Sequence, residues 1–238
     1  MLTRLAFIAA LVFGFTAPAY AVPARIIILR HGEKQDAYQL CSVGVQRSLA
    51  LAAQYLGKGA TDSLFASGET PAAFFSITLH TLELASPAAQ SWGLPQTLYS
   101  AVPIAGNSTY GDSEVVLNAR TQQAAADVLA NPAWNGKTVV LVWEHKHIAN
   151  KKLEKAYPGQ KVTLRQLLGL DQLGSQVPDK WEGDNYDYFW SVTYGNPGSP
   201  VPTAFTSTKQ NFDKPYDAVP HNDWGTPETL PKNSGCKS

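Results

Sequence analysis

Short apolar runs alternate with amphipathic stretches along most of the chain, which is the pattern of strands alternating with helices. The β-branched run at residues 25–29 is typical of a strand buried on both faces, and Thr-Val-Val-Leu-Val-Trp at 138–143 is the clearest strand of the sequence. Further strands are predicted at 63–66, at 97–102 and, as the last of the chain, at 187–194.

Amphipathic stretches lie between these strands and are predicted to be helices. The first, residues 42–56, begins with a serine suited to an N-cap, and its apolar residues fall on one stripe. The others cover residues 72–92, about 113–130 and a short stretch ending near 156, with a break expected at Pro87. Strands alternating with helices favour a three-layer α/β/α sandwich with a mainly parallel sheet.

The chain is long enough for one sizeable domain. Of its 238 residues, 44% are hydrophobic and 16% are charged, which suits a single buried core over residues 22–195. The stretch 196–238 is rich in Pro, Gly, Asn and Ser and shows no periodicity. We expect it to be an irregular tail that packs on the domain surface or trails from it.

The first 21 residues have the features of a secretory signal peptide. Arg4 supplies the positive charge, residues 5–15 are an apolar run too short to span a bilayer comfortably, and Ala-Tyr-Ala at 19–21 fits a cleavage site. We expect cleavage after Ala21, which makes the mature protein secreted or periplasmic and leaves it no membrane attachment. A buried first helix and an uncleaved anchor are the alternatives.

Charge composition bears on the possible partners. Lysine plus arginine and aspartate plus glutamate both number 19, so the formal net charge is zero. Nucleic acids and anionic membranes both require a basic excess, and neither is therefore expected as a partner. Any anion must instead bind to a few residues in a local pocket.

Two cysteines, Cys41 and Cys236, lie in the expected mature chain. Export favours a disulfide between them, which would tie the tail to the region before the first helix. Two unpaired thiols are the alternative, because the sequence does not give the Cα separation that a disulfide requires.

Two histidines lie at the ends of predicted strands, His31 after the first strand and His145 after the strand at 138–143. Functional groups collect where the strands of such a sheet end. A neutral imidazole is a competent nucleophile toward phosphorus, and the guanidinium of the neighbouring Arg30 can hold phosphate oxygens. Gly32 lets the backbone bend away, so that a phosphoryl group can approach the ring of His31. Arg-His-Gly at a strand end is therefore a chemically suitable phosphate site.

Three segments carry a resemblance to a known family. Residues 26–34 followed by Ser-x-Gly at 42–44, the strand at 139–145 and the Trp/Asp-rich segment 181–187 resemble parts of the histidine phosphatase superfamily, also called phosphoglycerate mutase-like. The resemblance spans about residues 25–194, and the three segments follow in the family's order.

The resemblance implies a phosphoglycerate mutase-like fold and a phosphomonoesterase that needs neither metal nor cofactor. In such an enzyme His31 attacks phosphorus and becomes phosphohistidine, while Arg30 and His145 stabilise the phosphoryl oxygens. A carboxylic acid protonates the leaving alcohol, and water then hydrolyses the phosphohistidine. The implied ligand is a small phosphorylated substrate or phosphate itself, and the sequence specifies neither the substrate nor the oligomeric state.

The phosphate-binding cations depart from the family pattern. The family's second arginine is missing, since no arginine lies between Arg47 and Arg120, and the best alignment places His80 in its position. A histidine can donate to phosphate but lacks the fixed fork of an arginine. His80 is therefore a candidate for substrate binding, with a plain helix residue as the alternative. Lys34 is a further candidate, with a solvated surface charge as its alternative.

The proton donor departs from the pattern as well. Glu69, after the predicted second strand, is our first candidate, ahead of Asp112, Glu114 and Glu144. Glu144 abuts His145, but consecutive side chains of a strand point to opposite faces, which would turn Glu144 away from the site.

Three alternatives stay open. His145 and His147 are spaced like a zinc pair, since strand alternation would place both rings on one face, but no third ligand with suitable spacing accompanies them. The missing arginine also fits a degenerate family member that binds phosphate or a phosphorylated ligand with little or no catalysis. The third is a mutase, against which export argues because the substrates of a mutase are cytosolic.

Overall fold

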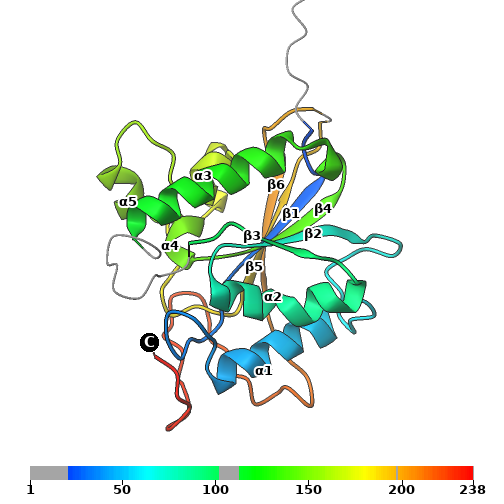
Figure 1. Ribbon diagram of the computed structural model, residues 1–238, viewed down its shortest axis with the longest axis vertical. Coiled ribbons are helices and arrows are strands. Elements are labelled where there is room, and N and C mark those ends of the chain that lie inside the picture. Colours follow the sequence, from blue (N-terminus) through cyan, green and yellow to red (C-terminus); the bar gives the residue numbers. More distant parts are fainter. Residues whose placement is uncertain (1–20, 102–112, 197, 238) are drawn as a thin grey trace, which may run out of the picture.

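The computed structural model describes residues 21–101, 113–196 and 198–237 (Figure 1). The expected signal peptide lies outside these residues except for Ala21, and so does Asp112. Within the described parts of the chain, no helix combines the length and the apolar character needed to cross a membrane.

One sheet of six strands forms the centre of the described structure, with the spatial order β3-β2-β4-β1-β5-β6. The four strands from β3 to β1 run parallel, whereas β5 is antiparallel to β1 and β6 is antiparallel to β5. The strands are β1 (Arg25–Arg30), β2 (Pro71–Ser76), β3 (Gln96–Leu98), β4 (Thr138–Trp143), β5 (Tyr188–Thr193) and β6 (Ala204–Lys209).

Helices cover both faces of the sheet, with α1 and α2 on one face and α3 on the other (Figure 1). The helix α1 (Ser42–Leu51) continues into a π-helical turn, Ala52–Leu56. The other helices are α2 (Leu79–Trp92), α3 (Glu114–Ala130), α4 (His145–Ile148), α5 (Lys151–Ala156) and α6 (Leu164–Leu167), with 3-10 turns at Pro132–Trp134 and Leu170–Gln176.

Strand alternation divides the apolar side chains between two cores, one on each face of the sheet. In β1, Ile27 and Leu29 pack toward α1 and α2, whereas Ile26 and Ile28 pack toward α3. All four side chains are at most 1% exposed. The three-layer α/β/α sandwich with a mainly parallel sheet that the sequence predicts is therefore confirmed.

The second strand lies elsewhere than predicted. Residues 63–66 form no strand, whereas Pro71–Ser76, the expected start of a helix, is β2. Phe74 and Phe75 are fully buried in opposite cores, as a central strand requires. The helix α2 starts only at Leu79 and runs through Pro87 without the expected break. A short apolar run fits a buried strand and a buried helix equally well, which is why the boundary was misplaced.

The stretch from Gly195, expected to be irregular, contributes the edge strand β6 to the sheet. Most β6 side chains are exposed, so the strand lacks the apolar alternation that would have revealed it. Beyond Lys209 the described chain forms no further helix or strand, and it runs back along the domain to a disulfide between Cys236 and Cys41. The Cα atoms of the two cysteines are 5.1 Å apart, so the expected pairing is confirmed.

Candidate active site

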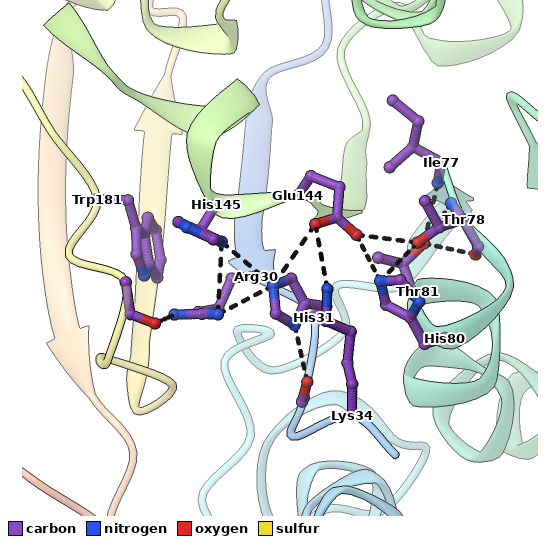
Figure 2. Close-up of polar contacts among 12 residues, drawn as sticks. Arg30, His31, Lys34, Ile77, Thr78, His80, Thr81, Glu144, His145 and Trp181 are labelled. Atoms are coloured by element: carbon purple, nitrogen blue, oxygen red, sulfur yellow. Dashed lines mark hydrogen bonds and ion pairs between the residues drawn. The ribbon is translucent and has the colours of Figure 1, made fainter. Parts of the chain in front are cut away.

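Two neighbouring parallel strands bring the predicted histidines together. The register of β1 and β4 pairs Arg30 with Trp143, and the backbone N–H of His31 donates to the Trp143 carbonyl at 2.9 Å. The two segments that follow β1 and β4 therefore leave the sheet side by side, at the carboxyl ends of its parallel strands. The side chains that follow these strands, including His145, converge on one point there (Figure 2).

The His31 ring is held in one orientation by the backbone beside it. Its Nδ1 lies 2.8 Å from the carbonyl oxygen of Gly32, so Nδ1 carries the proton and Nε2 keeps its lone pair. The ring is 1% exposed, and burial, with the positive charge of Arg30, lowers its pKa well below the usual value. His31 is therefore a neutral imidazole with its basic nitrogen turned toward the site.

Arg30 points its guanidinium at both histidines. Its Nη2 lies 2.9 Å from Nε2 of His31 and 3.5 Å from Nδ1 of His145. Its Nη1 donates to the carbonyl oxygens of Glu182 and Gly183, and its charged plane lies 3.8 Å from the ring centre of Tyr186. These contacts fix the fork of Arg30 and give the Trp/Asp-rich segment before β5 a structural purpose that the sequence did not reveal.

His145 completes a triangle with these two side chains. Its Nδ1 lies 3.2 Å from Nε2 of His31. Burial, followed by the positive charge of Arg30, lowers the pKa of His145 to about 2, so its ring is neutral. Because Nε2 of His31 has a lone pair, Nδ1 of His145 donates its hydrogen there. Donors that surround Nε2 of His31 can equally serve phosphoryl oxygens.

A carboxylate forms the second arm of the site. Glu144 turns toward His31, with Oε2 3.5 Å from Nε2 of His31 and Oε1 2.5 Å from Nε2 of His80. The hydroxyl of Thr78 donates to Oε1 at 3.1 Å. The expectation that Glu144 faces away was wrong, because the chain leaves the strand at Trp143 and alternation ends there.

His80 lies in the site, as expected from its place in the alignment. Its Nε2 faces the Glu144 carboxylate and its Nδ1 lies 3.2 Å from the Ala37 carbonyl, so an acceptor stands at each ring nitrogen. Burial alone would raise the pKa of Glu144, but His31, the hydrogen bond from His80 and the charge of Lys34 hold it well below its usual range. Glu144 is therefore ionised.

A cavity of about 200 Å³ opens beside this cluster. Lys34 lines it, with Nζ 3.9 Å from Oε2 of Glu144, so this side chain borders the candidate site. Glu114, one of the alternative proton donors, lines the cavity as well. The His31 ring itself lies behind Glu144 and His145, since these two line the cavity and His31 is almost fully buried.

Glu69, the first candidate for the proton donor, lies at the opposite end of the sheet. Its carboxylate binds Arg25 at 2.7 Å and accepts hydrogen bonds from the Thr138 hydroxyl and the Ala66 backbone. Arg25 begins β1 and His31 follows it, so about 17 Å separates the two ends of that strand. The assignment failed because Glu69 precedes β2 rather than following a strand.

The zinc pair considered from the sequence does not form. His145 and His147 lie in the first turn of α4, where residues two apart point in different directions. Nε2 of His147 binds the Asn118 side chain at 3.0 Å, away from His145. The ligand atoms of His31, Glu144 and His145 do gather within 4.8 Å of one another. The Arg30 guanidinium next to both histidines opposes a cation there and favours an anion.

A buried ionic cluster supports the loop that follows His31. Arg47 of α1 binds three carboxyl groups, at 2.7 Å from Glu33, 2.6 Å from Asp187 and 2.9 Å from Glu228, and all four side chains are at most 2% exposed. We refer to these residues as the Arg47 cluster. Gly44 allows the close approach of α1, because a Cβ there would lie 2.3 Å from the Glu33 carbonyl oxygen. Sequence reasoning missed this cluster, since its members are up to 195 positions apart.

No family model and no curated protein sequence matches the chain. Among solved structures, it is similar to a mycobacterial glucosyl-3-phosphoglycerate phosphatase, with 17% identity over 80% of this chain and 99% of the other, at a TM-score of 0.47. A protein entitled mycobacterial hydrolase 2 is 15% identical over 89% of this chain and 94% of its own, at a TM-score of 0.41.

A third solved structure is described as that of the putative phosphohistidine phosphatase SixA from Agrobacterium tumefaciens. It is 13% identical over 72% of this chain and 92% of its own length, at a TM-score of 0.38. Identities this low do not assign an activity, which must come from the site itself.

Proposed function

We propose that the protein is an exported phosphomonoesterase that forms a phosphohistidine on His31. One observation carries the proposal. The Gly32 carbonyl fixes the proton of His31 on Nδ1, so the lone pair of Nε2 points at a buried guanidinium and a second neutral histidine. A neutral nucleophile surrounded by donors is the arrangement that attack on a phosphoryl dianion requires.

In the first step, Nε2 of His31 attacks phosphorus and the bond between phosphorus and the ester oxygen breaks. The leaving alcohol takes the electron pair of that bond together with a proton from an acid of the site. Charge on the phosphoryl oxygens is stabilised by Arg30 and His145, whose N–H groups already converge on the nucleophile. Lys34 and His80 add donors from the other side of the site.

In the second step, water attacks the phosphohistidine. The bond between phosphorus and Nε2 breaks, its electron pair returns to the ring of His31, and the water loses a proton to the base that the first step produced. The ring is neutral again afterwards, as its lowered pKa requires. The cavity volume of about 200 Å³ supports a small phosphorylated compound as the substrate.

The direct test uses the oxidised chain from residue 22 and p-nitrophenyl phosphate. We expect turnover by the wild type and an acid-labile, alkali-stable phosphate label on the protein after a rapid quench. His31→Ala should lose both the label and at least 1,000-fold of the activity, whereas the matched control His221→Ala, at an exposed position, should keep both. Retained turnover in His31→Ala would exclude the proposal.

A second candidate function is binding of phosphate or a phosphorylated ligand with little catalysis. It is favoured by the ionised Glu144, which competes with phosphate for His80 and Lys34. This candidate predicts saturable binding of orthovanadate, followed by calorimetry, with no turnover of any aryl phosphate. Multiple turnovers of p-nitrophenyl phosphate that depend on His31 would rule it out.

Export is also part of the proposal. The disulfide between Cys41 and Cys236 supports it, because disulfides persist in oxidising compartments outside the cytosol. Expression of the whole chain in a bacterium with a secretory pathway should yield periplasmic or secreted protein that begins at Val22. N-terminal sequencing decides the matter, and a cytosolic product that begins at Met1 would contradict export.

A further inference from the structure

Glu144 occupies a place in the site that suits an anion. Its carboxylate oxygens lie within 3.9 Å of Nε2 of His31 and of Lys34, His80 and Thr78, and the last three can donate to a phosphoryl oxygen. The distance of 3.5 Å between Oε2 and Nε2 of His31 is that of a phosphorus atom poised for attack, about 3–3.5 Å. A carboxylate and a phosphoryl group cannot both occupy this place.

The surroundings let the carboxylate move without leaving the site. Glu144 is the residue before the four-residue helix α4, and its side chain is 13% exposed on the wall of the cavity. Rotation of the side chain toward the cavity takes the carboxylate away from His31, on the side where the rest of a bound substrate would lie. The leaving oxygen of an ester attacked by His31 points in the same direction, because attack and departure are in line.

We propose that Glu144 is the general acid of the phosphomonoesterase proposed above, and that its carboxylate yields its place beside His31 to the phosphoryl group of the substrate. This inference rests on the proposed function. The proton of the Glu144 carboxyl group passes to the ester oxygen as the phosphorus–oxygen bond breaks and the bond to Nε2 forms. The carboxylate left behind then accepts a proton from the attacking water, which restores the carboxyl group.

The negative charge of the bound substrate favours protonation of Glu144 before the phosphorus–oxygen bond breaks. Donors beside the carboxylate come from two parts of the fold, namely Lys34 after β1 and the pair Thr78 and His80 at the start of α2. Arg30 lies behind His31. A phosphoryl dianion takes over these donors and adds negative charge. Two anions in such a small buried space do not both stay ionised, so the carboxyl form of Glu144 is favoured.

Glu114 is the rival acid within the described residues. It lies on the same cavity wall, at the start of α3, and is half-buried. Glu114 has no ion pair or hydrogen bond to His31, His80 or Lys34, whereas Glu144 contacts all three. The two residues therefore make a matched pair, since each can be changed to glutamine on the wall of one cavity.

The test compares leaving groups of different basicity. General acid catalysis matters for an alkyl phosphate, whose alcohol is a poor leaving group, and hardly matters for 2,4-dinitrophenyl phosphate. For Glu144→Gln we expect kcat/KM to fall at least 100-fold with phenethyl phosphate and less than fivefold with the dinitrophenyl ester. Glu114→Gln should leave the ratio of the two esters at the wild-type value. Turnover of the dinitrophenyl ester also shows that each variant is folded.

A binding measurement provides a readout that does not depend on turnover. Glu144→Gln should bind inorganic phosphate at least tenfold more tightly than the wild type at pH 7.5, because the resident negative charge is gone. Equal losses with both esters, unchanged phosphate affinity, or a selective loss in Glu114→Gln instead would each overturn the assignment of Glu144. A wild type that turns over neither ester would overturn the proposed function, and this inference with it.

Discussion

Replacing Glu228 with glutamine should abolish a loss of stability that the wild type shows between pH 7 and pH 8.5. In the Arg47 cluster, one guanidinium faces three buried carboxyl groups, so full ionisation would leave an excess of two negative charges, and protonation of one carboxyl group halves that excess. Burial, followed by the neighbouring charge of Glu33, raises the pKa of Glu228 from 4.5 to about 9. Glu228 is therefore the protonated member at neutral pH.

The magnitude follows from proton linkage. A carboxyl group whose pKa is higher in the folded state stabilises the fold fully below its unfolded pKa of 4.5, and this contribution is lost as the pH rises toward 9. Between pH 7 and 8.5 the unfolded chain holds no proton on Glu228 and the folded chain holds most of one. The slope is then about −1.4 kcal/mol per pH unit, or a fall of about 2 kcal/mol over this range.

The titration of the histidines does not mask the fall in the free energy of unfolding between pH 7 and pH 8.5. Lowered histidine pKa values, such as those of His31 and His145, act in the opposite direction, because the unfolded chain takes up protons that the folded chain does not. Their effect is confined to pH values near and below the unfolded pKa of 6.5, so it is largely complete at pH 7. A falling stability above pH 7 is thus assigned to the Arg47 cluster.

The assay is urea unfolding followed by tryptophan fluorescence at pH 7.0, 7.75 and 8.5, with the disulfide kept oxidised. Glu228→Gln should show a flat profile, since the amide can donate to Glu33 where the carboxyl proton did, and it carries no charge to titrate. Glu182→Gln, on a partly exposed side chain paired only with Lys180 among the described residues, should follow the wild-type slope. A flat wild-type profile, or equal slopes in the wild type and Glu228→Gln, would refute the reasoning.

Three further perturbations address the tail, the loop and the site. Cys41→Ser combined with Cys236→Ser opens a loop of 195 residues, which should cost up to about 5 kcal/mol in urea unfolding, and an unchanged midpoint would contradict the disulfide. Gly44→Ala places a Cβ 2.3 Å from the Glu33 carbonyl oxygen, so calorimetry should show Tm lowered by about 5 °C or more, and an unaltered Tm would contradict the packing. Arg30→Lys keeps the charge but loses the fork, so kcat/KM for p-nitrophenyl phosphate should fall at least 100-fold, and near-wild-type activity would show that the fork is not needed.

The part of the site that the sequence predicted is the part encoded by continuous strands. Two strongly apolar runs, each followed by a histidine, fix the neighbours β1 and β4, and parallel strands end at a common edge. The sequence alone therefore predicts that Arg30, His31 and His145 lie close together. Lys34 followed from its position just after His31, whereas His80 followed from the family resemblance, whose second arginine it replaces in the best alignment.

The parts that were missed depend on exact boundaries or on distant partners. A shift of the second strand from 63–66 to Pro71–Ser76 moved Glu69 from the site edge to the opposite edge. One residue of difference in where β4 ends decides whether Glu144 faces the site, and apolar periodicity does not resolve a single residue. Partners such as Glu228 contact the loop that follows His31 across 195 positions, and no local pattern records such a pairing.

The loop that carries Lys34 is held in place by residues from the far end of the sequence. Its backbone carbonyl at Lys34 accepts a hydrogen bond from Lys237 at 2.7 Å, its last residue is Cys41, and its Glu33 meets Glu228 in the Arg47 cluster. The order of assembly therefore matters. During synthesis, His31 and β1 emerge long before the segment that braces them, so a partly made chain has this loop without its support. The loop gains its full set of contacts only when the tail has docked and the disulfide has closed.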